Sequence, residues 1–121
     1  MANDFKRFTV ADVNTSAGAS ASAVYTVPSS SSTAVESIVI GITLANKSSS
    51  GVTASVFLDN YDGSNDVYIV KDASIPAGSS LEVMSGNKLV LMGDGTTNDA
   101  IRVSASASSS VDATVSVLED V

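Results

Sequence analysis

The sequence predicts an all-β domain: an antiparallel β-sandwich of the immunoglobulin-like or jelly-roll kind, with about eight or nine short strands. Apolar and polar side chains alternate along several stretches, as in Val52–Asp59 and 113–117, which gives an extended segment one face of each kind. Turn-forming residues separate these stretches at regular intervals. No stretch shows the 3.6-residue period and the capping residues of a helix.

In the first half of the chain, strands are expected at 5–13, 22–28, 35–46 and 51–59. The apolar-rich segment 38–45 is typical of a buried strand. Residues 16–23 alternate Ala and Ser around a glycine, and we expect either a mobile lead-in or an arm extended against a neighbouring molecule.

In the second half, strands are expected at 66–72, 79–84, 87–92, 100–106 and 111–119. The dipeptide Asp62-Gly63 predicts a hairpin before the first of them, and Pro76-Ala77-Gly78 predicts a tight turn before the second. Gly86-Asn87 and Gly93-Asp94-Gly95 mark later loops. Serine runs at 29–32, 48–50 and 108–110 fall between expected strands and are interpreted as flexible loops.

A chain of 121 residues accommodates one domain. We divide it into an extended N-terminal segment, 1–20, and a β-sandwich domain, 21–121. The core has few large anchors, because the chain holds three Phe, three Tyr and no Trp. Part of the stability is therefore expected to come from neighbouring subunits.

Composition argues against several function classes. Six Lys and Arg face 13 Asp and Glu, for a net charge of −7. Such a surface repels phosphate, so we expect no nucleic-acid partner and no membrane partner. The chain has no Cys and no His, which removes thiolate metal clusters and the usual general base. We expect no cofactor.

One acidic loop has the composition of a calcium site. Residues 59–66 supply three Asp and two Asn around a glycine, and Asp59, Asp62 and Asp66 are the candidate metal ligands. The EF-hand register fails, however, because position one would be Leu58 and no Glu follows six residues after the glycine. A polar hairpin tip is the favoured interpretation.

Catalytic patterns are weak, and we expect no enzyme and no catalytic residue. Ser85-Gly86-Asn87-Lys88 matches a Ser-x-x-Lys spacing but lies in an expected hairpin turn, not on a helix. A glycosidase-like pair would need two of Glu36, Glu82 and Glu119 to converge across a cleft. Each is expected to face solvent from a strand.

Aromatic side chains are the candidate interface residues. Phe57, Tyr61 and Tyr68 are expected at the surface, either as partner contacts or as a cross-strand aromatic pair beside the Asp62-Gly63 hairpin. Phe5 and Phe8 of the N-terminal segment are candidates as well. That segment is expected to add a strand to a neighbour's sheet edge.

The string from Tyr68 to Val83, with the strands 89–91, 101–106 and 111–119 that follow, resembles small structural proteins of tailed bacteriophages, especially marine and cyanobacterial phages. The opening residues 1–8 resemble that group too. The likeness is strongest from 38 to 119. It departs at 93–99, where the group has a shorter Gly-Asp turn.

This resemblance implies a virion component present in many copies, made in the host cytoplasm. The expected function is non-enzymatic: capsid decoration, or a neck or tail accessory piece, that binds other virion proteins and itself. The alternative is a receptor- or carbohydrate-binding module of a tail fibre or tail tip. That alternative predicts an exposed aromatic platform beside residues 59–66.

Overall fold

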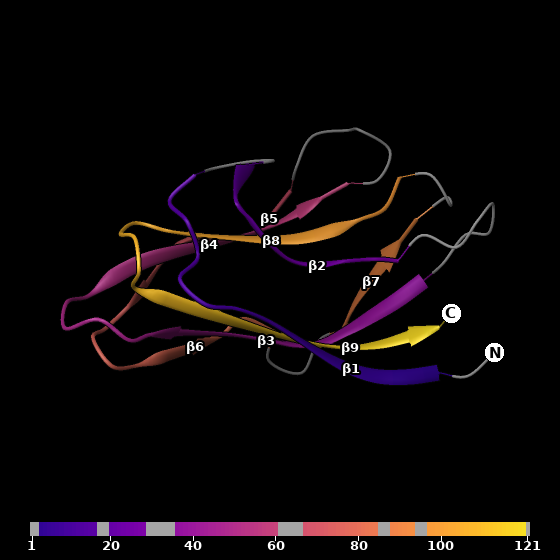
Figure 1. The fold of residues 1–121 in the computed structure, drawn as a ribbon, viewed down its shortest axis with the longest axis horizontal. Coiled ribbons are helices and arrows are strands. Elements are labelled where there is room, and N and C mark those ends of the chain that lie inside the picture. The colour runs from indigo at the N-terminus through magenta and orange to yellow at the C-terminus, as the bar shows by residue number, and fades with distance from the viewer. Residues whose placement is uncertain are drawn as a thin grey trace.

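The structure is a computed structural model that describes residues 3–16, 20–28, 36–60, 67–84, 88–93 and 97–120. Nine strands lie within these ranges, stacked as two layers (Figure 1). They are β1 (Asn3–Val10), β2 (Ser22–Thr26), β3 (Glu36–Asn46), β4 (Val52–Asp59), β5 (Val67–Ile75), β6 (Ser80–Glu82), β7 (Leu89–Met92), β8 (Ala100–Ala105) and β9 (Val111–Asp120). The prediction of an all-β sandwich is confirmed.

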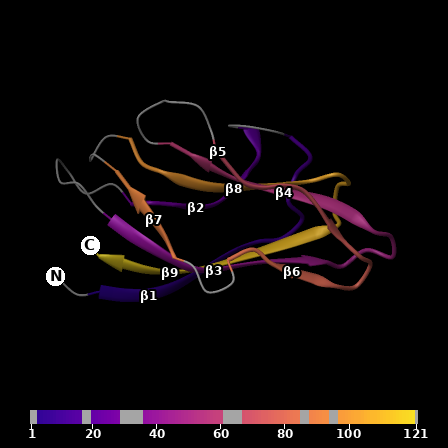
Figure 2. The ribbon, with the colours of Figure 1, turned by 180° about the vertical axis from the view of Figure 1, so that it is seen from behind.

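The two layers are antiparallel sheets of five and four strands. The five-stranded sheet has the order β1-β9-β3-β6, with β7 also paired to β3, and the four-stranded sheet has the order β2-β8-β4-β5. Figure 2 shows the same two layers from behind, with both chain ends at one end of the five-stranded sheet. Asn3 and Asp120 are paired there across β1 and β9.

Most expected strands lie within two residues of their observed bounds, and the strand expected at 5–13 ends three residues earlier, at Val10. The strand expected at 66–72 is the clearest exception, because β5 continues to Ile75. It does so through a double register shift opposite β4, at which Asp72 adopts a left-handed conformation with φ 51°. The Ser55 hydroxyl accepts a hydrogen bond from the Asp72 amide at 2.9 Å, which replaces the missing ladder bond.

The turn expected at Pro76-Ala77-Gly78 is present. The Ser79 amide donates to the Pro76 carbonyl at 3.1 Å, and Gly78 has φ 70°, a conformation that favours glycine. The Asp62-Gly63 and Gly86-Asn87 signals lie outside the described residues, as does the serine run at 29–32.

The core between the sheets is mainly aliphatic. Alternate residues of both sheets meet there, as the period-two pattern predicts. Side chains with no exposed surface include Val39, Ile42, Leu44, Val56, Leu91, Ile101, Val103, Val111, Val115 and Val117.

A buried asparagine organises the serine-rich loop between β3 and β4. Asn46 Nδ2 donates to the carbonyls of Ser50 and Ile75, at 2.8 and 2.9 Å, and its Oδ1 accepts from the amide and hydroxyl of Ser48. The loop at 48–50 is therefore hydrogen-bonded to the buried Asn46, which is itself bonded to β5. The sequence had predicted a flexible loop there.

The N-terminal stretch belongs to the sandwich. Residues 3–10 form edge strand β1 and pair with β9 over their whole length, from Asn3–Asp120 to Val10–Ala113. Beyond it, Val13 is buried and its amide donates to the carbonyl of Val111. The N-terminal segment was expected to add a strand to a neighbour's sheet. As far as residue 13, it is instead hydrogen-bonded to β9 of its own chain.

Candidate functional site

Four apolar side chains lie in register across the outer face of the five-stranded sheet. Phe5 of β1 is opposite Leu118 of β9, Leu118 is opposite Ile38 of β3, and Ile38 is opposite Val90 of β7. We call these four residues the apolar row. Phe5 is 77% exposed and Val90 is 54% exposed, whereas Ile38 and Leu118 are half-buried between their neighbours.

Two further apolar side chains adjoin the row. Ile40, 40% exposed, is the extra residue at a register shift in β3, and Met92, 43% exposed, follows Val90 by two residues. The same sheet face is polar farther along, where Thr9, Thr114 and Thr43 are in register. The apolar patch is therefore a local departure from an ordinary solvent face.

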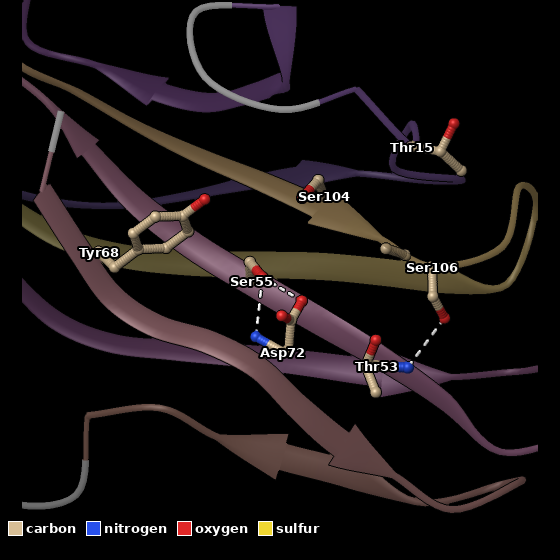
Figure 3. Close-up of a pocket in the computed structure, with 8 residues that line it drawn as sticks. Thr15, Thr53, Ser55, Tyr68, Asp72, Ser104 and Ser106 are labelled. Carbon is tan, nitrogen blue, oxygen red and sulfur yellow. Dashed lines mark hydrogen bonds between the residues drawn. The ribbon is translucent and has the colours of Figure 1, made fainter.

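The second candidate is a shallow hollow of about 200 Å³ on the outer face of the four-stranded sheet (Figure 3). Hydroxyl side chains line most of it, so we call it the hydroxyl hollow. Its lining residues are Thr15, Thr53, Ser55, Tyr68, Asp72, Ser104, Ala105 and Ser106.

Several of these polar groups are already hydrogen-bonded to one another. The Ser55 hydroxyl contacts both the amide and, at 3.4 Å, the carboxylate of Asp72, and Ser106 Oγ accepts from the Thr53 amide at 3.0 Å. The Ser55 oxygen thus supports the bulge in β5 as an acceptor.

Tyr68 forms one wall of the hollow. Its ring packs on Phe57 with centroids 5.0 Å apart, and the Lys71 ammonium lies 5.4 Å from its centroid. Tyr68 is 47% exposed but Phe57 only 2%. The cross-strand aromatic pair is therefore present, whereas the expectation of a surface-exposed Phe57 is wrong because β5 and Tyr68 cover it.

The third candidate is a buried polar cluster between the sheets. The Tyr25 hydroxyl of β2 donates to Glu119 Oε2 of β9 at 2.6 Å and lies 2.7 Å from the Ser37 hydroxyl of β3. Lys6 of β1 places its ammonium 2.9 Å from Glu119 Oε1. The cluster thus joins both sheets and neutralises its buried carboxylate.

Electrostatics of the cluster favour a structural role. Burial raises the pKa of Tyr25 well above its ordinary value, and the hydrogen bond to Glu119 raises it further. The hydrogen bond to Glu119 also raises the pKa of Lys6. Tyr25 therefore stays neutral and Lys6 stays charged around neutral pH, and neither is poised to transfer a proton.

The three glutamates considered for hydrolysis do not converge. Glu36 and Glu82 are exposed on the five-stranded sheet, at opposite halves of β3. Glu119 is 2% exposed, which contradicts the expected solvent-facing position. It lies on the inward face because it continues the phase of Val115 and Val117.

The candidate calcium loop is only partly described. Asp62, Asp66 and Tyr61 lie outside the described residues, and the carboxylate of Asp59 pairs with Arg102 at 2.9 Å. Across the described ranges, no three Asp or Glu side chains gather in a way that could hold a metal ion. Of the Ser-x-x-Lys pattern, only the exposed Lys88 is described.

Of the two N-terminal aromatic candidates, only Phe5 faces solvent. Phe8 points inward, where its ring packs on Tyr25 with centroids 4.7 Å apart.

The described part of the chain contains no helix long and apolar enough to cross a membrane. Comparison with known protein families, with characterised proteins and with solved structures finds no match.

Proposed function

We propose that this protein is a non-enzymatic structural subunit of a bacteriophage particle, acting as capsid decoration or as a neck or tail accessory piece. It works through protein–protein contacts, both with copies of itself and with other virion proteins. The apolar row is the observation that carries this proposal, because a contiguous exposed patch on one sheet face is suited to binding protein.

Two other observations support the proposal. The resemblance to small phage structural proteins covers most of the chain and rests on sheet alternation and turns, not on a site. The polar groups at Glu119 and at Ser55 are hydrogen-bonded within the sandwich, Glu119 to Tyr25 and Ser55 to the Asp72 amide.

The proposal is tested by mass spectrometry of gradient-purified particles of a phage whose genome encodes this chain. The protein should co-purify with the major capsid protein through a salt wash, at a fixed copy number per particle. Hundreds of copies would indicate the shell and six to twelve the neck or tail, on the order expected for the symmetry of each part. A chain found only in the host lysate would overturn the proposal.

The hydroxyl hollow favours a second function, the binding of a receptor carbohydrate at a tail fibre or tail tip. Sugars are bound by hydroxyl and carboxylate groups beside an aromatic ring, and Asp72, Ser104 and Tyr68 supply those groups. Calorimetry with neutral oligosaccharides distinguishes the two functions. Heat that is lost in Asp72→Ala would favour carbohydrate binding, and no heat from any glycan would argue against it.

A further inference from the structure

The apolar row is long enough to form a contact between two sheets. Neighbouring strands lie about 4.8 Å apart, so four side chains in register span roughly 14 Å. Its two ends, Phe5 and Val90, are its most exposed members. Two sheets that face each other along such a row would enclose the six side chains of the patch, including Ile40 and Met92.

We propose that a second copy of this chain docks face to face on the five-stranded sheet, with the two apolar rows stacked along a two-fold axis. This inference rests on the protein-contact role proposed above. It adds the partner, the surface and the relative orientation of the two copies.

Charges on the two sides of the row determine that orientation. Arg7 follows Phe5 by two residues on β1, and Lys88 precedes Val90 by two residues beside β7. Because β1 is parallel to β3 and β7 is antiparallel to it, both cations lie on the same side of the row. The exposed Glu36, two residues before Ile38, lies on the other side.

Two two-fold arrangements bring the rows together. If the axis runs along the strands, Arg7 lies opposite Lys88 of the second copy, and the like charges repel. If the axis runs along the row, the cationic side of one copy covers the anionic side of the other. Glu36 of each copy then lies beside Lys88 of the other, twice per dimer, so we assign the second arrangement.

The polar half of the same face explains why the contact stays local. The threonine row of Thr9, Thr114 and Thr43 has no apolar surface to bury comparable to Phe5. Its members can remain hydrated at the rim of the dimer, which is the usual arrangement around an apolar interface centre. Thr9 therefore provides a matched control position, on the strand and face of Phe5 but outside the row.

Sedimentation velocity over a concentration series tests the dimer. The wild-type protein should form dimers, and Phe5→Glu should weaken the dimer at least tenfold, because it replaces the largest apolar side chain of the row by a charge. Thr9→Glu adds the same charge and should change the dimer dissociation constant less than about twofold. All variants should keep the wild-type circular dichroism spectrum, because Phe5 is 77% exposed.

Charge exchange tests the orientation. Glu36→Lys and Lys88→Glu should each weaken the dimer several-fold, on the order of 3- to 10-fold, and the double exchange should restore it to within about twofold. A wild-type chain that stays monomeric at about 1 mM overturns the inference. So does a Phe5→Glu variant that dimerises like Thr9→Glu, or a double exchange that fails to recover.

These outcomes are separate from those of the particle experiment. A monomer found in purified virions would leave the structural function standing and remove the dimer. A dimer that is absent from virions would support the dimer contact and overturn the structural function.

Discussion

Replacing Tyr25 by phenylalanine removes one hydroxyl from the buried cluster that joins the two sheets. The ring keeps its shape and its packing on Phe8, so the change is confined to two hydrogen bonds. It leaves Glu119 Oε2 and the Ser37 hydroxyl without their shared partner, the Tyr25 phenol. Both residues are at most 2% exposed, so solvent cannot readily replace the lost partner.

The expected cost follows from the chemistry of those bonds. A hydrogen bond to a charged group contributes about 1.5–3 kcal/mol, and an unsatisfied buried group adds to that loss. Lys6 still neutralises the carboxylate, which keeps the penalty below the 3–5 kcal/mol or so of a broken buried ion pair. We therefore expect the free energy of unfolding to fall by about 3 kcal/mol, and Tm by roughly 12 °C for a domain of this size.

Urea denaturation at pH 7, followed by circular dichroism, measures this change. Tyr68→Phe is the matched control, because Tyr68 is half-exposed, and its effect should stay within about 0.5 kcal/mol. Both variants should keep the wild-type m-value if they change only stability. Equal unfolding midpoints for the two variants would refute the structural role assigned to the cluster.

Three further predictions follow from local features. Since the folded protein holds the Tyr25 proton at a raised pKa while the unfolded chain releases it near pH 10, stability should decrease as the pH rises above about 10. Tyr25→Phe should show a smaller alkaline loss, and an identical pH profile would contradict this. Ser109 has φ 55°, so Ser109→Gly should stabilise the protein by up to about 1 kcal/mol, whereas Ser108→Gly should not; chemical denaturation of both variants decides it. Because Asp59 is paired with Arg102, millimolar Ca²⁺ should leave Tm unchanged; a shift abolished by Asp59→Asn would reverse the interpretation of that loop.

Much of the fold was predictable because alternation is a local property of a strand. Val52, Ala54 and Val56 face the core, and the intervening Thr53 and Ser55 face outward, as their period indicates. The extension of β5 to Ile75 was not predictable in this way. It depends on a bulge that Ser55 of another strand stabilises.

The same alternation also indicated the buried cluster, but the charged residue types at those positions argued against burial. Glu119 is in phase with Val115 and Val117, and Lys6 is in phase with Phe8 and Val10. Strict periodicity would have directed both toward the other sheet, where Glu119 is buried and Lys6 reaches it from the exposed edge strand. A charged residue is rarely buried without a partner, however. The partner was hidden in the sequence because Tyr25 and Glu119 are 94 residues apart.

The apolar row could not be predicted from the sequence for a related reason. Phe5 alone was a candidate contact, but its alignment with Leu118, Ile38 and Val90 depends on the registers of three strand pairings. Registers arise from long-range packing, which a single sequence does not display. The exposed fraction of Phe57 was mispredicted likewise, because Tyr68 covers it from a different strand.

The central position of β9 has a consequence for how the molecule forms. β9 lies between β1 and β3 and pairs with each along most of its length, yet its residues follow β1 by about a hundred positions. During synthesis on the ribosome, β1 leaves the exit tunnel long before its pairing partner exists. The five-stranded sheet can therefore close only after β9 has been synthesised, and until then Phe5 is exposed on an unpaired strand that chaperones or a neighbouring nascent chain can capture.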